Sequence, residues 1–203
     1  MSNDLFPIVI ERPMRADARR NRARVLEAAR TCFAEQGLDA QVDDVARRAG
    51  VGVGTVYRHY PTKDALLRAL ADDHFERMEG ILAEVAEIPD AWEAFRAFVV
   101  RSVETMAADR GLAQVLAWRP EAMSEAAQAR PQLQVAVEEL VERGKKARAL
   151  RPDIEWWDVP MMMCVLGHAV QAQGPNMHIE RYVTLLLDGV RAKGSTPLPP
   201  VSA

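Results

Sequence analysis

The stretch "GVGVGTVYRHYPTKDALL" at residues 50–67 decides the fold of this chain. Three glycines alternate with valines, a run of basic and aromatic residues follows, and a Pro-Thr pair precedes an apolar, periodic segment. The stretch fits three interpretations: a glycine loop that cradles phosphate, a strand with a turn, or a unit that binds nucleic acid. The glycines lack the GxxxxGK[ST] spacing and follow no predicted strand, which argues against a phosphate loop.

The sequence around this stretch has the periodicity of helices. An apolar stripe at helical spacing predicts a helix over 16–36, and a second, shorter helix is predicted over 42–48. Gly50 can adopt the positive φ that a tight turn requires. A third helix at 53–59 would then complete a helix-turn-helix unit.

The predicted third helix separates into two sides on a helical wheel. Val53, Val56 and Tyr60 share one side and are the expected anchors against the first two helices. We predict that the other side, with the start of the next helix, contacts DNA through Gly54, Thr55, Tyr57, Arg58, His59 and Lys63. Arg58 carries the fork of donors that pairs with guanine in the major groove, whereas hydroxyl, ring and ammonium groups suit phosphates.

Charge is distributed unevenly along the 203 residues, although the formal net charge is only −3. Residues 11–60 hold ten arginines and seven acidic residues, so this part is basic while the remainder is acidic. Such asymmetry is typical of a protein in which one part binds a polyanion. Six arginines lie before or within the start of the first helix: Arg12, Arg15, Arg19, Arg20, Arg22 and Arg24. They fit either an arm that reaches DNA or a solvated segment that continues as the polar face of a helix.

Helical periodicity continues through the rest of the chain, without strand alternation or repeats. The sequence therefore predicts an all-α fold of about nine helices, with an N-terminal three-helix DNA-binding domain and a C-terminal helical domain. The later helices are expected at 62–87, 90–108, 111–118, 121–149 with a break at Pro131, 155–171 and 177–192. The expected divisions are a flexible arm at 1–14, the helix-turn-helix domain at 15–61, the second domain at 62–193 and a disordered tail at 194–203.

Tryptophan and methionine are concentrated in the later part of the sequence. Such side chains form adaptable apolar ligand pockets, and they also fill ordinary cores. The residues that could line such a pocket are Trp92, Phe95, Met106, Trp118, Met123, Trp157 and Met162, and whether they form an effector pocket depends on the family resemblance given below. The three consecutive methionines at 161–163 cannot share one helical face, so one of them should meet a neighbouring helix or a second subunit.

No arrangement of residues predicts catalysis or metal binding. The histidines lack an HExxH or comparable partner, and Cys32 and Cys164 lack metal-ligand spacing, so two buried free thiols are expected. No apolar run approaches the roughly 18 residues needed to span a bilayer, and the N-terminus lacks the features of a signal peptide. We therefore expect a cytoplasmic protein that is not an enzyme, takes no cofactor or metal, and has no membrane partner.

Residues 23–70 resemble the DNA-binding domain of the TetR family of transcriptional regulators almost throughout. The matching positions are Phe33, Gly37, Asp44, Val45, Ala46, Ala49, Gly50, Val51, Gly54, Val56, Tyr57, His59, Lys63 and Leu66. One departure is Gln41, where the family usually has a threonine that caps the second helix and contacts phosphate. Glutamine is a weak N-cap, so that phosphate contact is not carried over.

The resemblance implies a repressor that binds a palindromic double-stranded DNA operator as a homodimer. It also implies that the C-terminal domain binds a small apolar effector, and that the long helix at 62–87 carries the resulting change to the operator-binding unit. Dimerisation would use the last two long helices, through Val183, Leu186, Leu187 and Val190. An alternative is a DNA-associated regulator whose C-terminal domain binds a protein partner instead of a small ligand.

Overall fold

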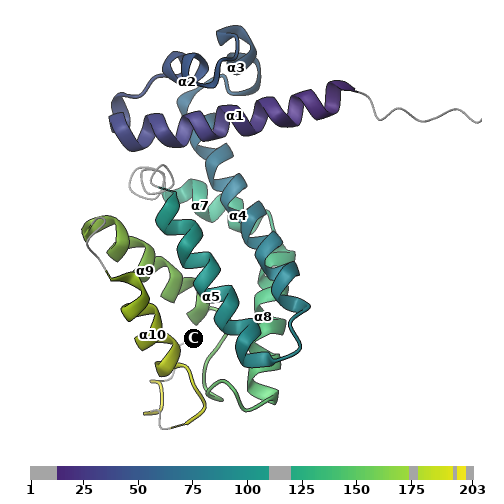
Figure 1. Cartoon of the computed structure of the whole chain (residues 1–203), viewed down its shortest axis with the longest axis vertical. Helices are drawn as coiled ribbons and strands as arrows, with labels where there is room; N and C mark the ends of the chain where they lie inside the picture. Colours follow the sequence, from purple (N-terminus) through teal and green to yellow (C-terminus); the bar gives the residue numbers. More distant parts are fainter. Residues whose placement is uncertain (1–12, 110–119, 174–177, 194–195, 200–203) are drawn as a thin grey trace, which may run out of the picture. The chain divides into compact units, whose positions relative to one another are not determined.

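The computed structural model describes residues 13–109, 120–173, 178–193 and 196–199 (Figure 1). These residues form nine α-helices and one short 3-10 helix, and they contain no strand, which confirms the predicted all-α fold. The chain divides into two compact units, Met1–Leu66 and Leu67–Ala203. The helix predicted at 111–118 lies outside the described residues.

Four short or medium-length elements make up the first unit: α1 (Pro13–Gln36), a 3-10 turn (Gly37–Asp39), α2 (Val42–Ala49) and α3 (Val53–His59). α1 packs against α2, and α2 packs against α3, around the buried side chains of Leu26, Phe33 and Val45. α1 begins three residues earlier than predicted. Proline is favourable at the first position of a helix, because an N–H at that position would make no hydrogen bond within the helix. Residues 13–14 are therefore helical and do not belong to the predicted flexible arm.

Gly50 makes the turn between α2 and α3, with a φ of 61°. Its N–H donates to the Arg47 carbonyl at 3.2 Å, and the Val51 N–H donates to the Ala46 carbonyl at 3.1 Å, the pattern of a Schellman motif. Arg24 of α1 donates to the Gly50 carbonyl at 3.2 Å. The predicted role of Gly50 is confirmed, and Arg24 adds a support that the spacing of the sequence did not indicate.

The N-cap position of α2 is occupied by Gln41, although a shorter polar side chain is a better cap at this position. The Gln41 backbone N–H donates to the Asp44 carboxylate at 3.3 Å, and its side-chain amide donates to the Asp39 carbonyl at 2.9 Å. Asp44 thus supplies the return bond of a capping box. The Gln41 amide is engaged with the preceding turn, consistent with leaving it out of the predicted DNA contacts.

Side-chain caps mark the starts of the fourth and fifth α-helices of the chain. Thr62 Oγ1 accepts a hydrogen bond from the Ala65 N–H at 3.1 Å, and Asp90 Oδ1 accepts one from the Glu93 N–H at 2.8 Å. Pro131 restarts the chain as a helix, as predicted. The helices are α4 (Lys63–Ala86), which begins in the first unit, α5 (Ala91–Ala108), α7 (Pro120–Gln128), α8 (Pro131–Lys146), α9 (Asp158–Gln173) and α10 (Ile179–Gly189).

Helix α5 lies at the centre of the second unit, in contact with α8, α9 and α10 (Figure 1). Phe95 and Val99 of α5 are fully buried among the apolar side chains of these helices. Met106 of α5 lies against Gly167 of α9, where a Cβ would overlap the methionine's terminal methyl group. The two helices therefore approach closely at a flexible thioether, a side chain that adapts readily to its surroundings.

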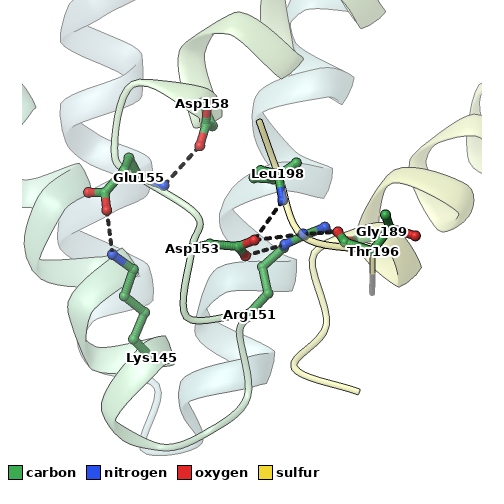
Figure 2. A network of polar contacts seen from close by, with 8 residues as sticks. All are labelled: Lys145, Arg151, Asp153, Glu155, Asp158, Gly189, Thr196 and Leu198. Carbon is green, nitrogen blue, oxygen red and sulfur yellow. Dashed lines mark hydrogen bonds and ion pairs between the residues drawn. The ribbon is translucent and has the colours of Figure 1, made fainter. Parts of the chain in front are cut away.

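A polar network fastens the end of α10 to the connection between α8 and α9 (Figure 2). Buried Arg151 donates to both carboxylate oxygens of Asp153, at 2.6 and 2.9 Å. The same guanidinium donates to the Gly189 carbonyl at 3.2 Å and to the Thr196 carbonyl at 2.5 Å. One arginine thus joins the α8–α9 connection to the end of α10 and to the segment that follows α10.

The segment after α10 is held by the same connection. The Ala192 N–H donates to the Ala149 carbonyl at 3.2 Å. The Leu198 N–H donates to the Asp153 carboxylate at 2.8 Å (Figure 2). The prediction of a disordered tail is therefore corrected for residues 196–199. Composition suggested disorder because the segment is rich in proline and small residues, but its backbone finds partners in the folded unit.

Candidate nucleic-acid interface

Val56 holds α3 to the rest of the first unit, with a side chain that is 1% exposed. Tyr60, at the end of the helix, is half-buried. Val53 is 43% exposed, so its predicted role as an anchor is wrong. The helical wheel placed Val53 on the inner side, but the residue opens a helix of only seven residues between the exposed Gly52 and Gly54, where little of the unit covers it.

The outward side of α3 brings several of the predicted DNA-contacting residues together. Arg58 and His59 are exposed, and Thr55 is half-buried. Apart from its chain neighbours and the backbone of its own helix, no described atom lies within 4 Å of the place that a Gly54 Cβ would occupy, so the backbone there is open to close approach. A short helix with a guanidinium, an imidazole, a hydroxyl and bare backbone on one side suits the dimensions and donor pattern of a major groove.

Tyr57 has a neighbouring carboxylate on α2, that of Asp43. Its hydroxyl donates a hydrogen bond to the Asp43 carboxylate, and this bond raises the pKa of the Tyr57 phenol. The residue remains 43% exposed, so its ring is part of the outward surface. A phosphate can only accept hydrogen bonds, and it would have to compete with Asp43 for the single phenolic proton. The sequence did not indicate this partner of Tyr57.

Lys63 lies at the first position of α4. Its ammonium group is 5.7 Å from the centre of the Phe33 ring, a cation–π arrangement that keeps the side chain beside the first unit. The first N–H groups of a helix have no partner within the helix, and the helix dipole favours an anion there. Lys63 is thus placed where a phosphate would meet both a charge and backbone donors.

The N-terminal basic run is helical over its described part. Arg19 and Arg20 are exposed on α1, and Arg20 forms an ion pair with Asp17. Arg24 binds the turn after α2, as described above. Arg12 lies outside the described residues. A basic helical surface therefore replaces the predicted arm from Pro13 onward.

The described residues predicted for an effector pocket lie at different depths in the second unit. Four of them lie in the core of the second unit or pack against it: Trp92, Phe95, Met106 and Met162. Trp157 is 43% exposed, and Met123 is half-buried on α7. Trp118 lies outside the described residues. Some of these residues thus lie in the core and others on the surface. The sequence had allowed for this, because tryptophan and methionine also fill ordinary cores.

Two hollows on the described surface of the second unit lie away from these residues. One, of about 960 Å³, lies between residues 89–91 and α8 and is lined by charged side chains such as Glu138, Glu142 and Lys146. The other, of about 490 Å³, lies between α4 and α5 and also has charged side chains in its wall. Neither matches the apolar pocket that the methionines and aromatic residues predict.

The residues predicted for a dimer interface face the core of their own chain. Val183, Leu187 and Val190 are buried, and Leu186 packs against the same core. The exposed apolar side chains of the last two helices are Met161 (65%), Val165 (62%), Tyr182 (47%) and Leu185 (59%). α5 and α9 pack against α10, so the predicted residues take part in contacts within the same chain.

Within the described residues, no helix combines the length and apolar character that crossing a membrane requires. The same residues contain no group of three His, Cys, Asp or Glu side chains able to hold a metal ion. Cys32 is buried, and burial raises the pKa of its thiol, whereas Cys164 is exposed. The expectation of two buried thiols is thus wrong for Cys164.

The chain is similar to known proteins over most of its length. Residues 25–70 match the family described as bacterial regulatory proteins, tetR family, and residues 90–192 match the C-terminal domain of SbtR-like transcriptional regulators. The crystal structure of a TetR transcription regulatory protein from Mycobacterium vanbaalenii has 35% sequence identity and a TM-score of 0.64, over 88% of this chain and 99% of that chain. A TetR transcriptional regulator from Streptomyces coelicolor has 31% identity and a TM-score of 0.61, over 85% and 99%. An HTH-type transcriptional repressor from Mycobacterium tuberculosis is 27% identical, over 85% of this chain and 81% of its own length.

Proposed function

The chain belongs to the TetR family of bacterial transcriptional regulators, and from this premise we propose that it represses transcription as a homodimer on a palindromic operator. As a member of that family it is a DNA-binding regulator with an N-terminal helix-turn-helix unit. The observation that carries the proposal is the outward side of α3. Arg58, His59 and the open backbone at Gly54 lie together on the exposed side of a helix that Val56 anchors.

The residues of this surface have separate roles in the proposal. Arg58 reads a base, because its guanidinium can donate to both O6 and N7 of a guanine. Thr55 and His59 donate to phosphates, which fix the position of the helix in the groove without reading sequence. Tyr57 contacts the DNA through its ring and its hydroxyl oxygen, because its hydroxyl group donates its hydrogen bond to Asp43.

Replacing Arg58 with alanine is expected to weaken operator binding by about 1–3 kcal/mol and to relax the preference at one base pair in each half-site. The base contact is lost while α3 keeps its anchor at Val56. Fluorescence anisotropy with an operator selected from random sequences, and with single-base variants of it, measures both effects. Arg58→Lys is the matched control: it keeps the charge but not the planar fork, so it should retain binding to random DNA and lose the discrimination. Unchanged discrimination in Arg58→Ala would exclude a base contact.

Replacing Lys63 with alanine is expected to weaken binding to every DNA sequence alike. One fewer phosphate would be neutralised, so the slope of log K against log salt should fall by about one. Titrations of operator and random DNA between about 50 and 200 mM salt give this slope. Lys146→Ala, at an exposed position of α8, serves as the control and should leave the slope unchanged. A wild-type slope in Lys63→Ala would remove Lys63 from the interface.

The dimer interface of this proposal is the exposed apolar face of α9 and α10, formed by Met161, Val165, Tyr182 and Leu185. The two helices pack against each other, so these side chains lie on neighbouring elements. Exposed apolar side chains on two helices that pack together favour an interaction site there. Two-fold pairing through it would present two recognition helices to half-sites about one helical turn apart, roughly 34 Å.

We also propose that a small apolar effector enters the second unit between α5 and α9, where Met106 lies against Gly167. Movement of the flexible thioether would open apolar space beside the core with little change in the backbone. A thermal-shift screen with apolar compounds tests the idea, because a ligand that binds the folded state raises Tm by mass action. Compounds that raise Tm should also lower operator affinity. If none raises it, the alternative of a protein partner for this unit is favoured.

A further inference from the structure

Ser102 places a hydroxyl group without a partner in the second unit. Its side chain on α5 is fully buried, and its Oγ forms no hydrogen bond with any described residue. Threonines within the described helices behave differently: Thr31, Thr105 and Thr184 each donate to the carbonyl four residues earlier, at 3.0, 2.8 and 2.8 Å. Such a bond is one common way in which a hydroxyl within a helix is satisfied. A buried hydroxyl that lacks any such bond destabilises the protein until a partner is supplied.

Met106 lies one turn further along α5, on the same side of the helix as Ser102. Its terminal methyl group occupies the space that Gly167 of α9 leaves by having no side chain. Met163, one turn before Gly167 on α9, is buried as well. A methionine side chain has three rotatable bonds and repacks readily. Rotation of Met106 away from Gly167 would therefore open apolar space next to the Ser102 hydroxyl.

We propose that Ser102 is a specificity-determining residue for the effector, and that it selects a neutral, mostly apolar molecule with one hydrogen-bond acceptor, such as the carbonyl of a ketone or an ester. The Ser102 hydroxyl donates to this acceptor, while the apolar body of the molecule takes the space that Met106 vacates. This role rests on the proposed function, in which an effector enters between α5 and α9.

The molecule is neutral because the described part of the second unit offers no free counterion in its interior. The other buried polar side chains described there are His74, Asp109 and Arg151, and all three already take part in other interactions. A charge without a partner in an apolar core is costly, whereas a carbonyl needs only a donor. Ser102 supplies that donor without giving up another hydrogen bond.

A thermodynamic cycle with three compounds of similar size tests the hydroxyl. Benzylacetone carries a ketone, butylbenzene lacks it, and phenylbutyrate carries a carboxylate. Isothermal titration calorimetry gives the Kd of each compound for the wild type and for Ser102→Ala. The change is expected to weaken benzylacetone binding about threefold to tenfold and to leave butylbenzene binding unchanged, because one neutral hydrogen bond is lost. Phenylbutyrate should bind the wild type at least about tenfold more weakly than benzylacetone does.

Thr105→Ala is the matched control. It removes a hydroxyl from the same helix, at a half-buried position in the wall of the hollow between α4 and α5, and it should leave all three Kd values unchanged. The Tm of ligand-free Ser102→Ala should equal or exceed that of the wild type, because the hydroxyl has no bond to lose. A lower Tm, an equal loss for benzylacetone and butylbenzene, or a loss of benzylacetone binding in Thr105→Ala would each overturn the role of Ser102. Phenylbutyrate binding as tight as that of benzylacetone would overturn the neutral class.

Met106→Ala separates the role of Ser102 from the proposed effector function. Removing the side chain leaves apolar space of the kind that binds small apolar molecules, so both neutral compounds should bind this variant at least as tightly as the wild type. If only Met106→Ala binds them, the wild type admits no effector here, and Ser102→Ala in that background still decides whether the hydroxyl selects a ketone. If benzylacetone binds through Ser102 and leaves operator affinity unchanged, the effector function fails and the site stands. If neither compound binds either protein, no site lies beside Ser102 and its proposed role is wrong.

Discussion

Replacing Leu185 with glutamate is expected to give a monomer that binds the operator at least about 100-fold more weakly. Leu185 is 59% exposed on α10, and the same apolar face continues through Met161 and Val165 of α9. Two-fold pairing would bury the new carboxylate among apolar side chains, where a charge without a partner is costly. A monomer presents one recognition helix, so the gain from binding two half-sites at once is lost. Sedimentation velocity gives the mass, and anisotropy gives the affinity.

Two comparisons separate this result from general damage to the fold. Val135→Glu introduces the same charge at a 52% exposed position of α8 and should remain a dimer with wild-type affinity. Leu187→Glu places the charge in the core of the second unit, and it should unfold that unit instead of dissociating a folded dimer. If Leu185→Glu and Val165→Glu are both dimers, the interface lies on another face.

The sequence indicated that α10 is an apolar helix, but the residues that it offered for a dimer interface lie in or against the core of their own chain. Apolar residues lie on more than one side of α10: Val183 and Leu187 face the core, while Tyr182 and Leu185 are exposed. The spacing of apolar residues indicates that a helix has apolar sides. It does not indicate which of these sides is covered by another helix of the same chain. The neighbouring methionines of α9 show the same division, since Met163 is buried and Met161 is 65% exposed.

Most of what the sequence predicted correctly depends on short-range chemistry. Thr62 and Asp90 cap their helices with bonds that span three residues, and Gly50 makes its turn through its own φ. The residues predicted to contact DNA lie together for a related reason, since nearly all of them come from one helix of known period. The members of the pocket set come from several helices, whose relative placement no spacing encodes, and in the structure four of them lie in or against the core while Trp157 is exposed.

Contacts between distant residues were not predictable from the sequence. Arg24 reaches a turn 26 residues later, and Arg130 reaches carboxylates more than 50 residues earlier. Nothing in their local patterns distinguishes these two arginines from the solvated ones. Their roles depend on which helices the apolar core brings together, and polar bridges of this kind become visible only once that packing is known.

Replacing Arg151 with methionine is expected to lower the Tm of the second unit further than the same change at an exposed arginine. The change leaves the Asp153 carboxylate and the Gly189 and Thr196 carbonyls without their shared donor, because all three bind the one guanidinium (Figure 2). Unmade bonds at a largely buried site cost more than the loss of a surface pair. Circular dichroism gives Tm, and hydrogen exchange at the Leu198 amide reports release of the C-terminal segment. Arg181→Met, on the exposed side of α10, is the matched control.

Asp153→Asn isolates the contribution of the carboxylate charge through its dependence on pH. Hydrogen bonds from Arg151, and then from the Leu198 N–H, hold the pKa of Asp153 well below its ordinary value of 3.8. The folded protein therefore keeps this charge at acidic pH values where the unfolded chain takes up a proton, so the stabilisation is complete above the ordinary pKa and declines as pH falls below it. The Tm difference between the wild type and Asp153→Asn should be constant from neutral pH to about pH 5 and should narrow toward about pH 3. A difference that persists unchanged at the acid end would mean that the shape and hydrogen bonds of the side chain, and not its charge, fasten the C-terminal segment.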